Sequence, residues 1–136
     1  MQIAAEHYLP VDDTVCPTGE VTAVAGTEMD FRKTRIPEIS APALDHNFCL
    51  SDTVAPLRDV LWLTGQSGLQ MTVATTEPGI QIHDASGSHR PDKPTYEGFV
   101  IEPQRWPDAP NNSGFPSIKV TPNKPYHQTT SWSFKR

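Results

Sequence analysis

The sequence has no apolar run approaching the ~20 residues that a helix needs to cross a bilayer. Its start, Met1-Gln2-Ile3-Ala4-Ala5-Glu6, has neither the basic segment nor the hydrophobic run of a signal peptide. These absences predict a cytoplasmic protein with no membrane contact.

Positive charge and cysteine are also scarce. The 11 basic residues are outnumbered by 16 acidic ones, which gives a net charge of −5, and no basic run is longer than a pair. A nucleic-acid-binding surface usually carries a basic patch, so no nucleic acid partner is expected. The two cysteines, Cys16 and Cys49, make no disulfide framework and no C-x-x-C motif, and the five histidines are dispersed. No metal site is predicted, and both thiols are expected to be reduced and structural.

Proline and glycine, by contrast, are spread through the whole chain. The 14 prolines and 8 glycines leave pieces too short for ordinary helices, and no stretch keeps apolar residues at helical spacing for three turns. An all-β fold with one core follows. The clearest hairpin joins residues 58–63 to residues 69–75 through Gly65-Gln66-Ser67-Gly68, with Leu69, Met71 and Val73 on one face.

Five further strands are predicted from short β-prone runs bounded by turn or proline signals. They cover residues 20–24, 47–51, 79–83, 98–102 and 126–134. In the last strand, Tyr126, Trp132 and Phe134 share a face that is expected to pack inward. The proline-rich stretches 91–94 and 103–116 are too long for tight hairpins, so they are candidate binding loops.

Several blocks of the sequence resemble the aldose 1-epimerase (galactose mutarotase) family in order and spacing. The most specific are LDHNF at 44–48, TTEPGIQ at 75–81 and GFVIEPQ at 98–104; the others lie at 8–12, 17–21, 24–27 with 30–32, 107–111 and 115–117. The resemblance implies a galactose mutarotase-like antiparallel β-sandwich. It covers residues 1–136 as a single domain that corresponds to the C-terminal part of the family's larger domain.

The family resemblance implies a reaction that needs no cofactor, the interconversion of the α and β anomers of a free aldohexose of the galactose or glucose type. Ring opening requires a base at the C1 hydroxyl and an acid at the ring oxygen. In the family, the earlier half of the domain supplies two histidines and an arginine to the site, and one of these histidines is the acid. The motifs that carry them are not found in this sequence.

Glu102 is the general base by this resemblance. It lies at a predicted strand end before Pro103, so the chain turns away there and the side chain is left to face a cleft. The alternative is that Glu102 is an ordinary exposed carboxylate at a strand end.

Asp45 and Gln81 are the residues that the resemblance assigns to binding of sugar hydroxyls. A carboxylate accepts hydrogen bonds, whereas an amide both donates and accepts them, so the two side chains suit a polyol. The alternative for Asp45 is closure of a local turn. His46 is expected to be structural, because alternation directs neighbouring side chains to opposite faces of a strand.

His83 and Trp106 complete the set of candidate substrate-binding residues. Alternation places His83 on the same face as Gln81, which makes it a candidate local acid, although a solvated strand histidine is the common alternative. Trp106 follows the Glu-Pro-Gln block and is a candidate for stacking on a sugar ring, with core packing as its alternative.

Three functions remain open from the sequence. The chain is an aldose 1-epimerase, a catalytically silent carbohydrate-binding module, or a truncated relic without a ligand. In each case, part of a large sandwich exposes sheet edges and an apolar face. A homo-oligomer, or a complex with a chain that supplies the N-terminal half, is therefore expected.

Overall fold

The computed structural model describes residues 1–38, 43–86, 91–92 and 95–136, and these residues form short strands with almost no helix. The strands are β1 Gln2–Ile3, β2 His7–Tyr8, β3 Thr22–Ala23, β4 Asp45–Cys49, β5 Arg58–Thr64, β6 Gln70–Thr75, β7 Gly79–His83, β8 Val100–Gln104 and β9 Thr130–Lys135. One 3-10 helix, η1 Ala109–Asn111, interrupts the connection between β8 and β9.

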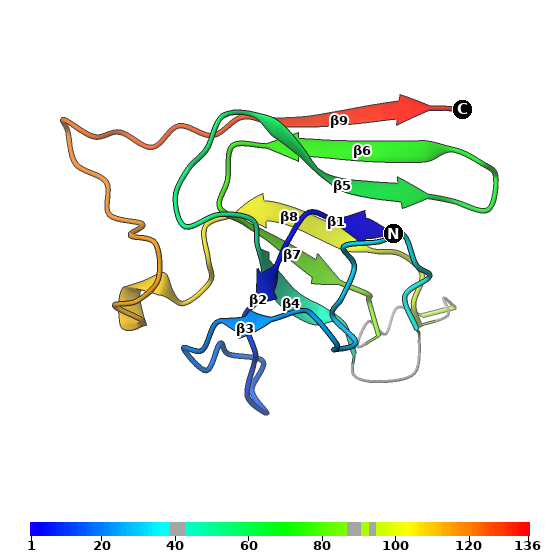
Figure 1. Ribbon diagram of the computed structural model, residues 1–136, viewed down its shortest axis with the longest axis horizontal. Coiled ribbons are helices and arrows are strands. Elements are labelled where there is room, and N and C mark those ends of the chain that lie inside the picture. Colours follow the sequence, from blue (N-terminus) through cyan, green and yellow to red (C-terminus); the bar gives the residue numbers. More distant parts are fainter. Residues whose placement is uncertain (39–42, 87–90, 93–94) are drawn as a thin grey trace.

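The strands form two antiparallel sheets. The four-stranded sheet has the order β1-β5-β6-β9, and the five-stranded sheet has the order β3-β2-β4-β7-β8. The chain passes from one sheet to the other between β6 and β7, and the sheets lie as two layers in Figure 1. The predicted all-β, antiparallel sandwich is confirmed.

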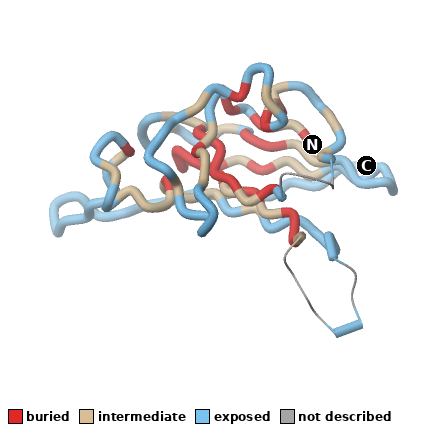
Figure 2. Tube along the Cα trace, turned by 90° about the horizontal axis from the view of Figure 1, so that it is seen from below, coloured by how far each residue is buried: buried red, intermediate tan, exposed pale blue. Residues whose placement is uncertain are grey.

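The core lies between the facing sides of the two sheets. Leu61 and Val73 of the four-stranded sheet and Phe48, Ile80 and Ile82 of the five-stranded sheet are all at most 1% exposed. Figure 2 shows this buried material in the middle of the molecule, with exposed chain around it. Burying a side chain of this size contributes about 1.5–3 kcal/mol, so these strands are held mainly by their inward faces.

The strand predictions succeed best where the pattern is long. The β5–β6 hairpin forms as expected, and β7 has the predicted bounds. The predicted strands at 47–51 and 98–102 are shifted, since β4 begins at Asp45 and β8 begins at Val100. The predicted strand at 20–24 shortens to β3, and β1 and β2 were not predicted because two residues show no alternation.

The prediction that the aromatic face of the last strand packs inward is wrong. Tyr126 is 49%, Trp132 44% and Phe134 61% exposed. Trp132 pairs with Val73 and Phe134 pairs with Met71, so both aromatic side chains lie on the core-facing side of the sheet. They remain exposed because β9 is an edge strand whose end runs out beyond the buried core (Figure 2).

Neither cysteine is paired. Cys16 is exposed, whereas Cys49 is buried on β4, where burial raises the pKa of its thiol to about 12. Cys49 therefore stays protonated at neutral pH, in agreement with a structural role. Within the described residues, no helix has the length and apolar character needed to span a membrane.

Candidate active site

Four of the predicted site residues lie together on the outer face of the five-stranded sheet. In the register of β4, β7 and β8, Asp45 is opposite His83, and Gln81 is opposite Glu102. Directly paired residues share a face, and residues two apart on a strand do so as well. The sheet therefore brings Asp45, Gln81, His83 and Glu102 to one surface, and the predicted shared face of Gln81 and His83 is confirmed.

Asp45 is the polar centre of this surface. The Gln81 Nε2 amide donates a hydrogen bond of 2.7 Å to Asp45 Oδ1, and His83 Nδ1 lies 3.6 Å from Asp45 Oδ2. The carboxylate thus accepts a hydrogen bond from Gln81 and lies close to His83 without a hydrogen bond to it. The alternative, that Asp45 serves to close a local turn, is not supported by this geometry.

Two buried acceptors on the same face have no hydrogen-bond donor among the described residues. They are Gln81 Oε1 and Asn47 Oδ1. A buried polar atom without a partner costs about 1–3 kcal/mol, and a hydroxyl donor of a ligand would relieve this cost at the half-buried Gln81. Asn47 is on this face because it lies two residues after Asp45, but it is 1% exposed and packs against Gly79, so it belongs to the support of the site.

Glu102 is exposed on β8, the outermost strand of the five-stranded sheet beside β7. Its carboxylate belongs to the same face as the Gln81 amide, which is its cross-strand partner. Glu102 is therefore an accessible carboxylate on the same face as the Asp45 carboxylate and the Gln81 amide, two groups that can hydrogen-bond to hydroxyls.

His46 lies on the other side of β4 from Asp45. It is 8% exposed, and its ring contacts the edge of the Tyr8 ring at a centroid distance of 5.8 Å. Burial lowers the pKa of this imidazole, which favours its neutral form. The prediction that His46 is structural is confirmed.

Trp106 is packed rather than open to a ligand. It is 4% exposed, its Nε1 donates a hydrogen bond of 2.9 Å to the Pro78 carbonyl, and its ring meets Phe115 at 5.2 Å. With Leu9 and Cys49 these rings form a second apolar cluster. The burial favours the packing alternative for Trp106, whose ring is not open to a sugar.

The two predicted binding loops differ in what the structure describes. The stretch 103–116 carries Trp106 and Phe115 into the second apolar cluster, so at least part of it packs on the protein itself. In the stretch 91–94, residues 93–94 lie outside the described residues. Among the residues with described positions, no group of three histidine, cysteine or acidic side chains is arranged to hold a metal.

Comparisons with a family profile and with individual proteins point to the same family. A sequence profile described as aldose 1-epimerase matches residues 1–133. The galactose mutarotase of Homo sapiens is 35% identical over 144 aligned residues, which cover 97% of this chain and 42% of the human protein. The aldose 1-epimerase of Escherichia coli K12 is 28% identical, with 98% of this chain and 44% of that protein covered.

A solved structure has the same fold. The GalM/aldose epimerase homologue from C. elegans matches with a TM-score of 0.87 and 23% identity, over 98% of this chain and 44% of that one. The chain thus spans less than half the length of the relatives it matches.

Gly79, at the start of β7, packs closely against Asn47 and Trp106, and this packing can be tested. A Cβ at this position would lie 2.5 Å from Asn47 Oδ1 and 3.0 Å from Trp106 Cδ1. Gly79→Ala should therefore lower the free energy of unfolding by about 1–3 kcal/mol, because the packed neighbours must shift. Chemical denaturation would measure this loss, and near-UV circular dichroism would report the movement of Trp106.

The matched control is Gly98→Ala, since a Cβ there meets nothing within 4 Å. Equal stabilities of the two variants would contradict the close approach of β7 to Asn47 and Trp106.

Proposed function

Because the chain belongs to the aldose 1-epimerase family, we propose that it takes part in interconverting the α and β anomers of a free aldohexose of the galactose or glucose type. The observation that carries the proposal is the shared face of Asp45, Gln81 and Glu102 in the β4–β7–β8 register. On that face the proposed sugar-binding side chains of Asp45 and Gln81 lie beside the accessible carboxylate of Glu102.

In this proposal, Glu102 is the general base. It removes the proton from the C1 hydroxyl of the cyclic sugar while the bond between C1 and the ring oxygen breaks and C1 becomes a carbonyl. An acid delivers a proton to the ring oxygen, which leaves as a hydroxyl. Rotation about the C1–C2 bond and the reverse proton transfers close the ring as the other anomer.

Asp45 and Gln81 bind the sugar. The Asp45 carboxylate accepts from a hydroxyl, and Gln81 Oε1, which is buried without a donor, accepts from a second one. The 2.7 Å bond from Gln81 Nε2 to Asp45 fixes the amide so that its oxygen points away from that carboxylate. The pair is therefore ordered before the sugar arrives, which lowers the entropy cost of binding.

The acid has two candidate sources. One is a histidine from the part of the family's domain that this chain does not match. The other is His83, which shares the face with Gln81 and has Asp45 as a neighbour at 3.6 Å. If neither acts, the chain is the alternative named above, a sugar-binding module without catalysis, for which the binding groups Asp45 and Gln81 are sufficient.

The first prediction concerns Glu102. The chain, alone or with a partner that supplies the rest of the domain, should accelerate the approach of fresh α-D-galactose or α-D-glucose to anomeric equilibrium, as followed by polarimetry. Glu102→Gln should reduce this acceleration by about 10²–10⁴-fold, because the base is lost while the shape of the side chain is kept. Glu20→Gln, at an exposed carboxylate elsewhere, is the control.

Three results of this experiment separate the functions. Acceleration that survives in Glu102→Gln contradicts the assigned base. Calorimetric binding of the sugar without acceleration indicates the binding module, and the absence of both indicates a relic.

The second prediction concerns His83. If His83 is the local acid, His83→Gln should lower the turnover of the chain alone by about 10²–10⁴-fold. Addition of a partner that carries the family's acid histidine should restore it. An unchanged polarimetric rate in His83→Gln would remove His83 from the mechanism and leave the unmatched part of the domain as the source of the acid.

We further propose that the part of the core-facing side of the four-stranded sheet that extends beyond the core is covered in solution. Trp132 and Phe134 lie there beside the half-buried Met71 and Leu63. Exposed aromatic residues grouped on one sheet face are typical of an interface. A second copy of the chain, or a chain that supplies the N-terminal half of the domain, is the expected occupant.

The third prediction tests this association. Sedimentation velocity at micromolar concentration should show a species larger than one chain, or one that forms when the N-terminal half of a relative is added. Trp132→Ser together with Phe134→Ser should weaken it. A monodisperse monomer whose sedimentation does not change when the N-terminal half is added would contradict the proposed interface.

A further inference from the structure

Glu77 is a fully buried carboxylate away from the site. It lies in the crossover between β6 and β7 and is 0% exposed. Neither of its carboxylate oxygens has an aligned hydrogen bond among the described residues. Since a buried charge needs compensation, the surroundings of Glu77 must supply a cation.

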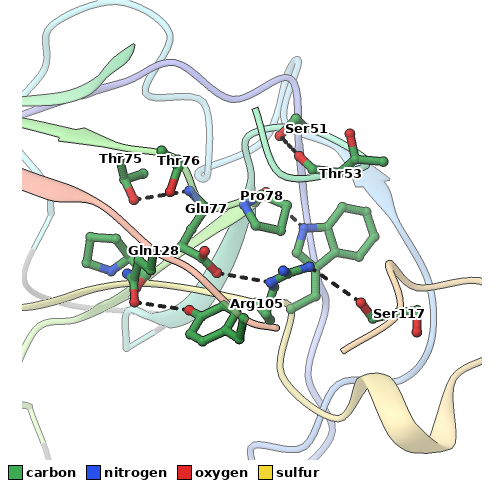
Figure 3. A network of polar contacts seen from close by, with 12 residues as sticks. Ser51, Thr53, Thr75, Thr76, Glu77, Pro78, Arg105, Ser117 and Gln128 are labelled. Atoms are coloured by element: carbon green, nitrogen blue, oxygen red, sulfur yellow. Dashed lines mark hydrogen bonds and ion pairs between the residues drawn. The ribbon is translucent and has the colours of Figure 1, made fainter. Parts of the chain in front are cut away.

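Arg105, the residue that follows β8, supplies that cation. Its Nε lies 3.3 Å from Glu77 Oε2, and Nη1 donates a long hydrogen bond of 3.4 Å to the Ser117 carbonyl. Figure 3 shows the Glu77 carboxylate directed at the Arg105 side chain. The ion pair thus joins the residues just before β7 to the residue just after β8.

A second contact holds the same end of β8. The guanidinium of Arg105 lies over the Tyr126 ring at 5.3 Å, and Tyr126 donates a hydrogen bond of 3.0 Å to Gln128 Oε1. Gln128 Nε2 in turn donates one of 2.8 Å to the carbonyl of Pro103. Burial raises the pKa of Tyr126, and the nearby Glu77 raises it further. Pro103 follows Glu102 in the chain. The contacts of Arg105, Tyr126 and Gln128 therefore end at the residue next to the proposed base.

Glu102 needs such support because of its place in the sheet. β8 pairs only with β7 among the described strands, so it is an edge strand that one neighbour holds in place. A slip by one residue would turn Glu102 to the opposite face. Asp45 and Gln81, on the inner strands β4 and β7, do not have this weakness.

We propose that the Glu77–Arg105 ion pair, with Tyr126 and Gln128, is a positioning device that fixes the register of β8 and thereby the carboxylate of Glu102. The proposal rests on the role of Glu102 given above. Glu77 and Arg105 touch no substrate in it and act only through the strand.

The test compares two ladders in one sample by amide hydrogen exchange. Arg105→Gln should speed amide exchange in the paired strands β7 and β8 at least about tenfold more than in the paired strands β5 and β6. Only the first pair of strands loses the contact with Glu77. Mutarotation should lose about tenfold in kcat with KM changed less than about threefold, because misplacing a catalytic group affects turnover more than binding. Arg105→Lys, which keeps the charge, should recover most of both losses.

Two further variants separate positioning from stability. The double variant Glu77→Gln, Arg105→Gln leaves no buried charge unpaired, so its melting temperature should recover. Amide exchange in β7 and β8 should remain fast and kcat should remain low. Lys119→Gln removes a nearby exposed cation and should resemble the wild type.

Equal acceleration of exchange in both ladders, or full recovery in the double variant, would overturn the proposal. If the wild-type chain, with or without its partner, neither binds nor converts an aldose, the proposed function fails. The ladder comparison then still decides whether the pair holds the register of β8.

Discussion

The crossover from β6 to β7 is the constraint on which the two layers depend. The carbonyl of Pro78 accepts hydrogen bonds from the backbone of Leu50 and Ser51 and from the Trp106 indole. Arg58 of the four-stranded sheet donates to the carbonyls of Thr75 and Glu77 on the same segment. Arg58 of one sheet and the segments that follow β4 and β8 of the other sheet thus donate to Thr75, Glu77 and Pro78, and β7 begins immediately after these residues. The register of β7 is set at this point, and with it the positions of Gln81 and His83.

Much of the fold and part of the site could be predicted from local pattern. Residues 58–75 alternate long enough to define a hairpin, and Gly79–His83 alternates clearly enough to place Gln81 and His83 on one face. The family resemblance supplied Glu102 and Asp45. The register explains why these residues belong together, because Asp45, Gln81 and Glu102 occupy neighbouring strands.

The failures come from information that local pattern does not contain. Alternation gives the correct inward side for Trp132 and Phe134, but it does not say whether another layer lies opposite. The choice between stacking and packing at Trp106 depends on Pro78 and Phe115, which are remote from each other in the sequence. The pairing of Glu77 with Arg105 is likewise a contact between distant residues, and nothing in either local sequence indicates it.

Pro103 has a consequence for the behaviour of the chain at high concentration. An edge strand with free N–H and C=O groups is a template on which another chain can add a strand, and such addition leads to aggregation. On β8 the proline removes a donor from the middle of that template, and Gln128 occupies its carbonyl. The outermost strand therefore carries an accessible carboxylate while offering fewer free backbone groups to a neighbouring molecule.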